Sequence, residues 1–182
     1  MSQVQSSHGA IASEDGQEHV QKHTIAILVE NKFGAYHRIA GLFAAKGYNI
    51  DSITVGPTEE PDVSRMTIVT RGDDQVIEQI TKQLNNLIDT LKVIDLTFES
   101  FVERDLVLVK VHSTPETRSE IMQIAEIFRA KVVDISPKTL TLEATGSQQK
   151  ADAIIKMLKP FGIKEMARTG RVALKREFQG EV

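Results

Sequence analysis

The sequence predicts an α+β protein made of two units that share one order of elements, β-α-β-β-α-β. Short apolar runs rich in β-branched residues alternate with segments whose apolar residues recur at helical spacing. Prolines and glycines separate these segments at turns, and the whole order occurs twice along the 182 residues. This order is the split βαβ pattern of a ferredoxin-like sandwich, so we expect two such sandwiches in one chain.

The first unit begins with TIAILVE, a short apolar run typical of a buried strand. In the helix that follows, Ile39, Leu42 and Phe43 recur at helical spacing, and Gly47 stands where helices commonly close. The acidic pair Asp73 and Asp74 favours the start of a second helix. The expected elements are strands over residues 24–30, 49–56, 64–71 and 91–96, a helix over residues 35–46 and a helix that begins near residue 73.

The second unit repeats the order without visible sequence similarity to the first. Thr114 and Pro115 supply an N-cap and a proline at the first helical position, and Ser147 caps the second helix. Pro160 and Gly162 end that helix. The expected strands cover residues 106–111, 131–136, 139–144 and one final strand from residue 163 through RVALKR.

Four segments follow from this division of the chain. They are a flexible tail over residues 1–23, a first domain over 24–98, a second domain over 99–176 and a short tail over 177–182. We interpret His19 and His23 as solvated tail residues rather than metal ligands. Each domain holds about 75 residues and leaves one sheet face and its edges uncovered, so a homodimer is expected.

Composition excludes several classes of function. The formal net charge is −3, which disfavours broad capture of nucleic acid or of an anionic membrane. The absence of cysteine excludes thiolate catalysis and cysteine-based zinc sites. No apolar run approaches the roughly 20 residues of a membrane span, and the polar first 23 residues lack the apolar core of a secretory signal. We expect a cytoplasmic protein.

Catalytic motifs are missing from the sequence. It contains no P-loop, no GxGxxG after a strand, no HExxH and no GxSxG. His37 and His112 have no nucleophile nearby in sequence, and we interpret both as surface residues. The adjacent charges of residues 103–105 are interpreted as an exposed strand end, and Glu59 and Glu60 as a solvated loop. We therefore expect a protein that is not an enzyme and binds no cofactor or metal of its own.

The loop over residues 31–34 is the one candidate binding site. It leaves a strand and enters a helix, where unpaired backbone N–H groups and the helix dipole favour an anion such as a carboxylate. Gly34 allows close approach of a ligand, and the Asn31 amide supplies an acceptor and two donors. The alternative is that both residues only make the turn, and these physical arguments leave the two interpretations equal.

Long runs in both halves resemble a known family. The stretch ENKFGAYHRIAGLFAAKGYNIDSITVGPTEEPDVSRMTIVTRGDD, with FRAKVVDIS and PFGIKEMARTGRVALKR further on, resembles the regulatory (small) subunit of acetolactate synthase, also called acetohydroxyacid synthase. The resemblance covers about residues 24–176, and the first half looks like an ACT domain. It implies a regulatory partner of a catalytic subunit that carries thiamine diphosphate, FAD and magnesium. It also implies feedback inhibition by a branched-chain amino acid, usually valine.

The resemblance also implies an effector site between two paired ACT domains. Effector positions of the family fall on Asn31, Gly34, Ala35 and Asn49, with the Gly34 and Ala35 amides holding the carboxylate. The family commonly has a small residue or proline at the position of Phe33, and leucine at the position of Tyr36. These two aromatic residues put the choice of branched-chain amino acid in doubt, because one methylene of fit changes binding by about 1–3 kcal/mol.

Two other functions stay open at this point. One is a free-standing amino-acid sensor that acts on some other enzyme. The other is an RNA-binding domain, since the same β-α-β-β-α-β order forms RNA-recognition folds. The second is the weaker of the two, because TIAILVE and SRMTIVTR carry no stacking aromatic residues.

Overall fold

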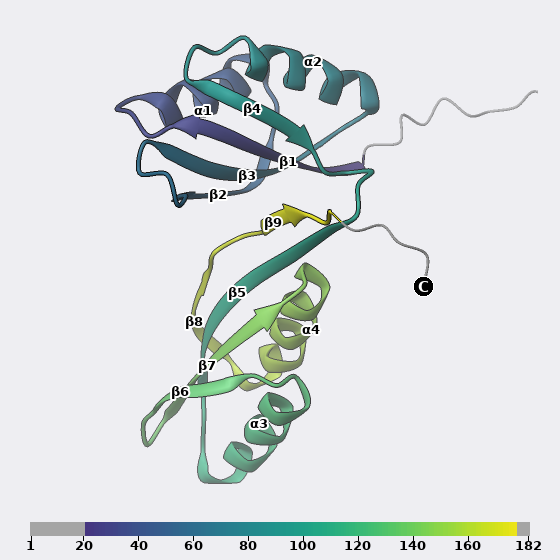
Figure 1. Ribbon diagram of the computed structural model, residues 1–182. Helices are drawn as coiled ribbons and strands as arrows, with labels where there is room; N and C mark the ends of the chain where they lie inside the picture. Colours follow the sequence, from purple (N-terminus) through teal and green to yellow (C-terminus); the bar gives the residue numbers. More distant parts are fainter. Residues whose placement is uncertain (1–20, 178–182) are drawn as a thin grey trace, which may run out of the picture.

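The computed structural model describes residues 21–177, which form two domains, each with helices on one face of an antiparallel sheet (Figure 1). The predicted α+β class and the repeated β-α-β-β-α-β order are confirmed. None of the helices in this part of the chain is long and apolar enough to cross a membrane.

The first domain has a four-stranded sheet in the order β2-β3-β1-β4. Alternate residues of the central strand, Ile25, Ile27 and Val29, are fully buried against the two helices, as the strand periodicity requires. The α1 helix ends at Gly47, whose φ of 71° is the left-handed conformation expected there. The elements are β1 (Gln21–Glu30), α1 (Ala35–Lys46), β2 (Ile50–Pro57), β3 (Val63–Gly72), α2 (Asp74–Asn85) and β4 (Thr90–Asp95).

The second domain has the strand order β6-β7-β5-β8. Thr114 and Ser147 cap the two helices as predicted, each accepting a hydrogen bond from a backbone N–H three residues later. The core lies between the sheet and the helices. The elements are β5 (Phe101–His112), α3 (Pro115–Ile127), β6 (Lys131–Ile135), β7 (Thr139–Gly146), α4 (Gln148–Leu158), the short 3-10 helix η1 (Lys159–Phe161), β8 (Ile163–Arg168) and β9 (Val172–Lys175).

The last predicted strand is in fact two. β8 completes the second sheet beside β5, whereas β9 pairs with the first four residues of β5, Phe101 to Arg104. Gly170 separates the two strands with a φ of 84°, which only glycine adopts without strain. The two-stranded ribbon of β5 and β9 lies against the sheet face of the first domain that the helices leave uncovered (Figure 1).

Two further expectations need correction. Residues 21–23 belong to β1 rather than to a tail, and the His23 side chain is fully buried, with hydrogen-bond contacts to Thr97 and the Gly72 carbonyl. Residues 1–20, with His19, and residues 178–182 lie outside the described part. Asp105 is not on an exposed strand end, because it is buried beside Arg168.

Candidate functional site

The loop between β1 and α1 forms the turn that the sequence suggested. Gly34 is the residue before α1, and its φ of 84° places the chain in the left-handed region. The Ala35 N–H donates to the Lys32 carbonyl at 3.2 Å, so this amide is engaged within the loop. Within residues 21–177 no backbone carbonyl accepts from the Gly34 N–H. Of the two amides expected to hold a carboxylate, only the one of Gly34 is available without rearrangement.

Asn31 is held at both ends of its amide group. Its Nδ2 donates to the Pro61 carbonyl at 3.1 Å, and the Tyr36 hydroxyl lies 3.1 Å from its Oδ1. The same hydroxyl lies 2.7 Å from Ser64 Oγ, and it carries one proton, so it donates to one of these oxygens at a time. Tyr36 thus fixes the orientation of Asn31, while the Phe33 side chain is fully exposed beside it.

Asn49 lies at the other end of α1. Its Nδ2 donates to Asp51 Oδ1 at 3.0 Å, and its carbonyl accepts from the Thr70 hydroxyl at 2.6 Å. Since α1 has 12 residues, it separates Asn49 from Asn31 by roughly 18 Å. One protomer therefore brings Asn31, Gly34 and Ala35 together but leaves Asn49 apart from them.

Asp51 joins Asn49 to a cavity between the two domains. It stands at a register shift between Ile50 and Ser52, and its Oδ2 accepts from Arg71 Nε at 2.9 Å, with Lys22 at 3.6 Å. Burial is the largest single influence and would raise the pKa of this carboxyl group, but the two cations together outweigh it and hold the pKa below its ordinary value.

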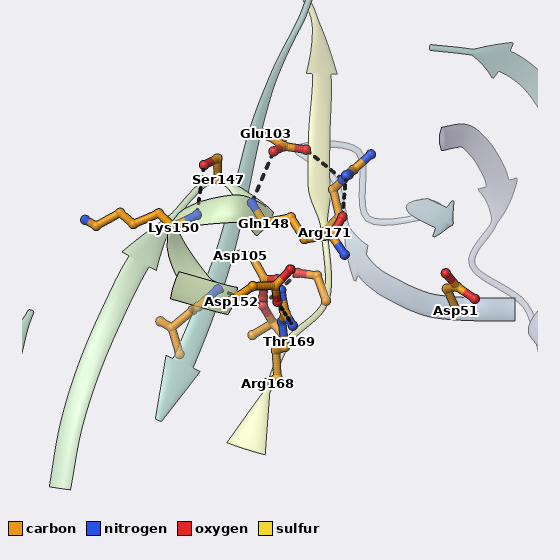
Figure 2. Close-up of polar contacts among 12 residues, drawn as sticks. Asp51, Glu103, Asp105, Ser147, Gln148, Lys150, Asp152, Arg168, Thr169 and Arg171 are labelled. Carbon is orange, nitrogen blue, oxygen red and sulfur yellow. Dashed lines mark hydrogen bonds and ion pairs between the residues drawn. The ribbon is translucent and has the colours of Figure 1, made fainter. Parts of the chain in front are cut away.

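The cavity has a volume of about 300 Å³ and was not anticipated from the sequence. The first domain lines it with residues of β2 and β3. The second domain contributes Asp105, Arg168 and the segment of residues 169–171 between β8 and β9 (Figure 2). Arg168 donates to Asp105 and Asp152, and Arg171 donates to Gln148 and forms an ion pair with Glu103, at distances of 2.6–2.7 Å. The walls of the cavity are part polar and part apolar, and the charges along them are largely paired.

A sequence signal for these ion pairs existed. Glu103 and Asp105 are two residues apart and so point to the same face of a strand, and Arg168 and Arg171 stand at the end of the chain's second unit. Antiparallel pairing of the first and last strands of that unit brings these opposite charges together. Because the sequence was interpreted as one last strand, the turn that places Arg171 was not predicted.

No metal centre appears in the described residues. Between Gln21 and Glu177 no group of three or more His, Cys, Asp or Glu side chains is placed to hold a metal ion. His37 and His112 are both exposed, as expected.

Comparison with known proteins decides the family. Residues 25–92 match the AHAS small subunit-like ACT domain, and residues 104–177 match the small subunit of acetolactate synthase. The protein is 58% identical over 160 residues to the acetolactate synthase small subunit of Aquifex aeolicus, covering 87% of this chain and 83% of that one. This chain belongs to the acetolactate synthase small subunits.

Two further acetolactate synthase small subunits support the same family. A probable one from Archaeoglobus fulgidus is 56% identical and covers 85% of this chain and 97% of its own. The crystal structure of the acetolactate synthase small subunit from Thermotoga maritima superposes with a TM-score of 0.79 at 43% identity, over 86% of this chain and 98% of that one. The resemblance drawn from the sequence is confirmed, including the ACT domain and a regulatory role.

Proposed function

We propose that this chain raises the activity of an acetolactate synthase catalytic subunit and makes that activity subject to feedback inhibition by valine or a related branched-chain amino acid. The thiamine diphosphate, FAD and magnesium of the reaction belong, in this proposal, to the catalytic subunit. This chain then contributes binding and coupling rather than chemistry.

The observation that carries the proposal is the turn at Gly34. An amino-acid effector presents a carboxylate, and the free Gly34 N–H at the N-terminus of a 12-residue helix is a donor of the kind that carboxylates bind. The neighbouring Asn31 Oδ1 is an acceptor suited to the effector's ammonium group. Ala35 is buried directly behind the turn, so its amide position is fixed by packing.

A second protomer completes this site in the proposal. Asn49 lies too far from Asn31 in one chain, but a partner placed in antiparallel fashion along α1 and β2 brings its own Asn49 to this turn. β2 is an edge strand of the first sheet, so one side of its backbone has no neighbour in the sheet. It also exposes Ile53 and Val55 to 41% and 43%. An apolar edge of this kind favours pairing with another copy.

Phe33 and Tyr36 set the effector preference in this proposal. Tyr36 holds Asn31 in place in the free protein, and Phe33 is an exposed aromatic residue at the mouth of the turn. Leucine and isoleucine each have one methylene group more than valine and differ from each other only in branching, so small changes at these positions alter the preference.

The experiment mixes this chain with an acetolactate synthase catalytic subunit and measures acetolactate formation. Activity rises on addition of the chain and falls again when valine, leucine or isoleucine is added. If activity does not rise, the role as an activator is wrong. If activity rises but none of the three amino acids lowers it, the effector assignment is wrong while the partner is right. Effector binding without any effect on activity would favour a free-standing sensor.

A further inference from the structure

The two domains are joined by more than a linker. Ala173 of β9 is buried with Ala26 and Leu96 of the first domain, and Ile94 and Phe101 pack beside them. The Arg65 guanidinium, on β3, donates to the Ala173 carbonyl at 3.1 Å. The last strand of the second domain thus forms part of the core on the open face of the ACT sheet.

Arg171 is the charged centre of this junction. Its Nη1 donates to the Thr24 hydroxyl of β1. Its Nη2 donates to Gln148 Oε1 of α4 at 2.6 Å (Figure 2). Its Nε lies 2.7 Å from Glu103 Oε2 as an ion pair, although the N–H is not aligned as a hydrogen bond. The guanidinium also lies 5.9 Å from the centre of the Phe101 ring. One side chain, only 15% exposed, therefore contacts both domains.

The neighbours of Arg171 contact the strand that leads from Asn49. The Thr54 hydroxyl of β2 donates to the Thr169 carbonyl at 3.1 Å. A Cβ on Gly170 would lie 3.0 Å from the Ser52 Cβ, so β2 and the segment of residues 169–171 are in close contact. Asn49 bonds to Asp51, and β2 continues through Ser52 and Thr54 to this segment, so the strand links the proposed effector position to the second domain.

We propose that Arg171 is a positioning residue that joins the ACT domain and the second domain into one cooperative unit, and that effector binding reaches the second domain through β2 and residues 169–171. This inference rests on the proposed function for its regulatory part only. Arginine suits the role, because its planar group bonds to several partners at once in a fixed geometry, which lysine does not reproduce. Packed side chains, hydrogen bonds and ion pairs of this kind can carry coupling between two sites when both sites bias them.

The structural part is tested on the full chain by calorimetric unfolding. The wild type is expected to unfold in one transition, and Arg171→Ala in two separate ones. Arg171→Lys, which keeps a positive charge beside Glu103, is expected to give an intermediate profile. The control is Arg118→Ala, because among residues 21–177 the Arg118 side chain bonds only to Ser113, Ser136 and Pro137 of the second domain. It should lower the melting temperature and leave a single transition. A single unfolding transition in Arg171→Ala, or two transitions in the wild type, would show that Arg171 does not join the two domains into one cooperative unit.

The regulatory part is tested with the catalytic subunit present. Arg171→Ala and Arg171→Lys should activate it within about twofold of the wild type, while the valine concentration for half-inhibition rises at least about tenfold. Direct binding of valine to the isolated chain should change by less than about threefold, since the effector residues are intact. Unchanged inhibition by valine overturns the coupling path. Failure of the wild type to bind valine, leucine or isoleucine overturns the proposed effector site instead, and the unfolding experiment still decides whether Arg171 joins the domains.

Discussion

The Tyr36 hydroxyl lies 3.1 Å from Asn31 Oδ1, so the residue that departs from the family pattern holds a residue that matches it. An effector ammonium that binds Asn31 Oδ1 competes with this contact. We expect Tyr36→Phe to lower the dissociation constant for valine by about 2–10-fold, the value of one net hydrogen bond. Calorimetric titration with valine measures it. Weaker binding would instead show that Tyr36 orients Asn31 for the ligand.

Asn31→Ala separates binding from activation. The variant removes a contact to a charged ligand, which is worth roughly 1.5–3 kcal/mol, so half-inhibition by valine should need about 10–150 times more effector. Activation of the catalytic subunit should stay largely intact, because Asn31 is exposed and its loss opens no core cavity. Activity assays with and without valine measure both effects. Loss of both together would mean that Asn31 serves the structure of the loop.

Alanine substitutions at Gly34 and Gly41, before and within α1, are expected to change the free energy of unfolding in opposite directions. Gly34→Ala forces a φ of 84° on a residue with a Cβ, and this Cβ meets the Arg38 guanidinium at 3.0 Å, so the free energy of unfolding should fall by about 1–2 kcal/mol. Gly41→Ala, within α1 and with nothing within 4 Å, should raise it by about 0.5–1 kcal/mol. Urea unfolding of both variants measures the difference. Equal effects would contradict the strained turn.

A charge substitution on β2 tests whether two copies of the protein associate through this strand. Ile53→Lys places a cation on the exposed apolar edge and should convert the expected dimer to a monomer at micromolar concentration. Ile127→Lys is the matched control, since Ile127 is 78% exposed on the second domain, at the end of α3. Light scattering after gel filtration measures the mass. A dimer that survives Ile53→Lys would move the interface elsewhere.

The Asp51 carboxylate is expected to make the free energy of unfolding depend on pH in the acidic range. Because its folded pKa is lowered, its stabilising contribution is present above the unfolded pKa of about 3.9 and is lost as the pH falls through the folded value. The difference in unfolding free energy between the wild type and Asp51→Asn, roughly 0.5–1 kcal/mol at pH 6, should therefore shrink below about pH 4. Urea unfolding across this range measures it. A constant difference would show that the charge contributes nothing.

Local signals in the sequence predicted most of the fold. Thr114 with Pro115, Ser147 and Gly47 each act within one helical turn, so they can be recognised from adjacent residues alone. The order β-α-β-β-α-β followed from periodicity. The turn at Gly34 was also predicted from local sequence, although the bonds of the Asn31 side chain with Tyr36 and Pro61 were not.

The junction between the domains could not be predicted in the same way. The contact of Arg171 with Thr24 joins residues 147 positions apart, and it depends on a break in the last strand at Gly170. The burial of His23 likewise depends on Thr97 and Gly72, which are distant in sequence. Such contacts are properties of the packed domains, and no short pattern encodes them.

The position of β9 has a consequence for how the protein is made. Ala173 covers Ala26 and Leu96, yet it leaves the ribosome roughly 80 residues after Leu96. At about 5–20 residues per second, the ACT sheet waits roughly 4–16 s with this face open to the cell. A chain interrupted before residue 172 carries a complete effector turn but an unfinished sheet face, and such fragments are expected to aggregate or to be degraded.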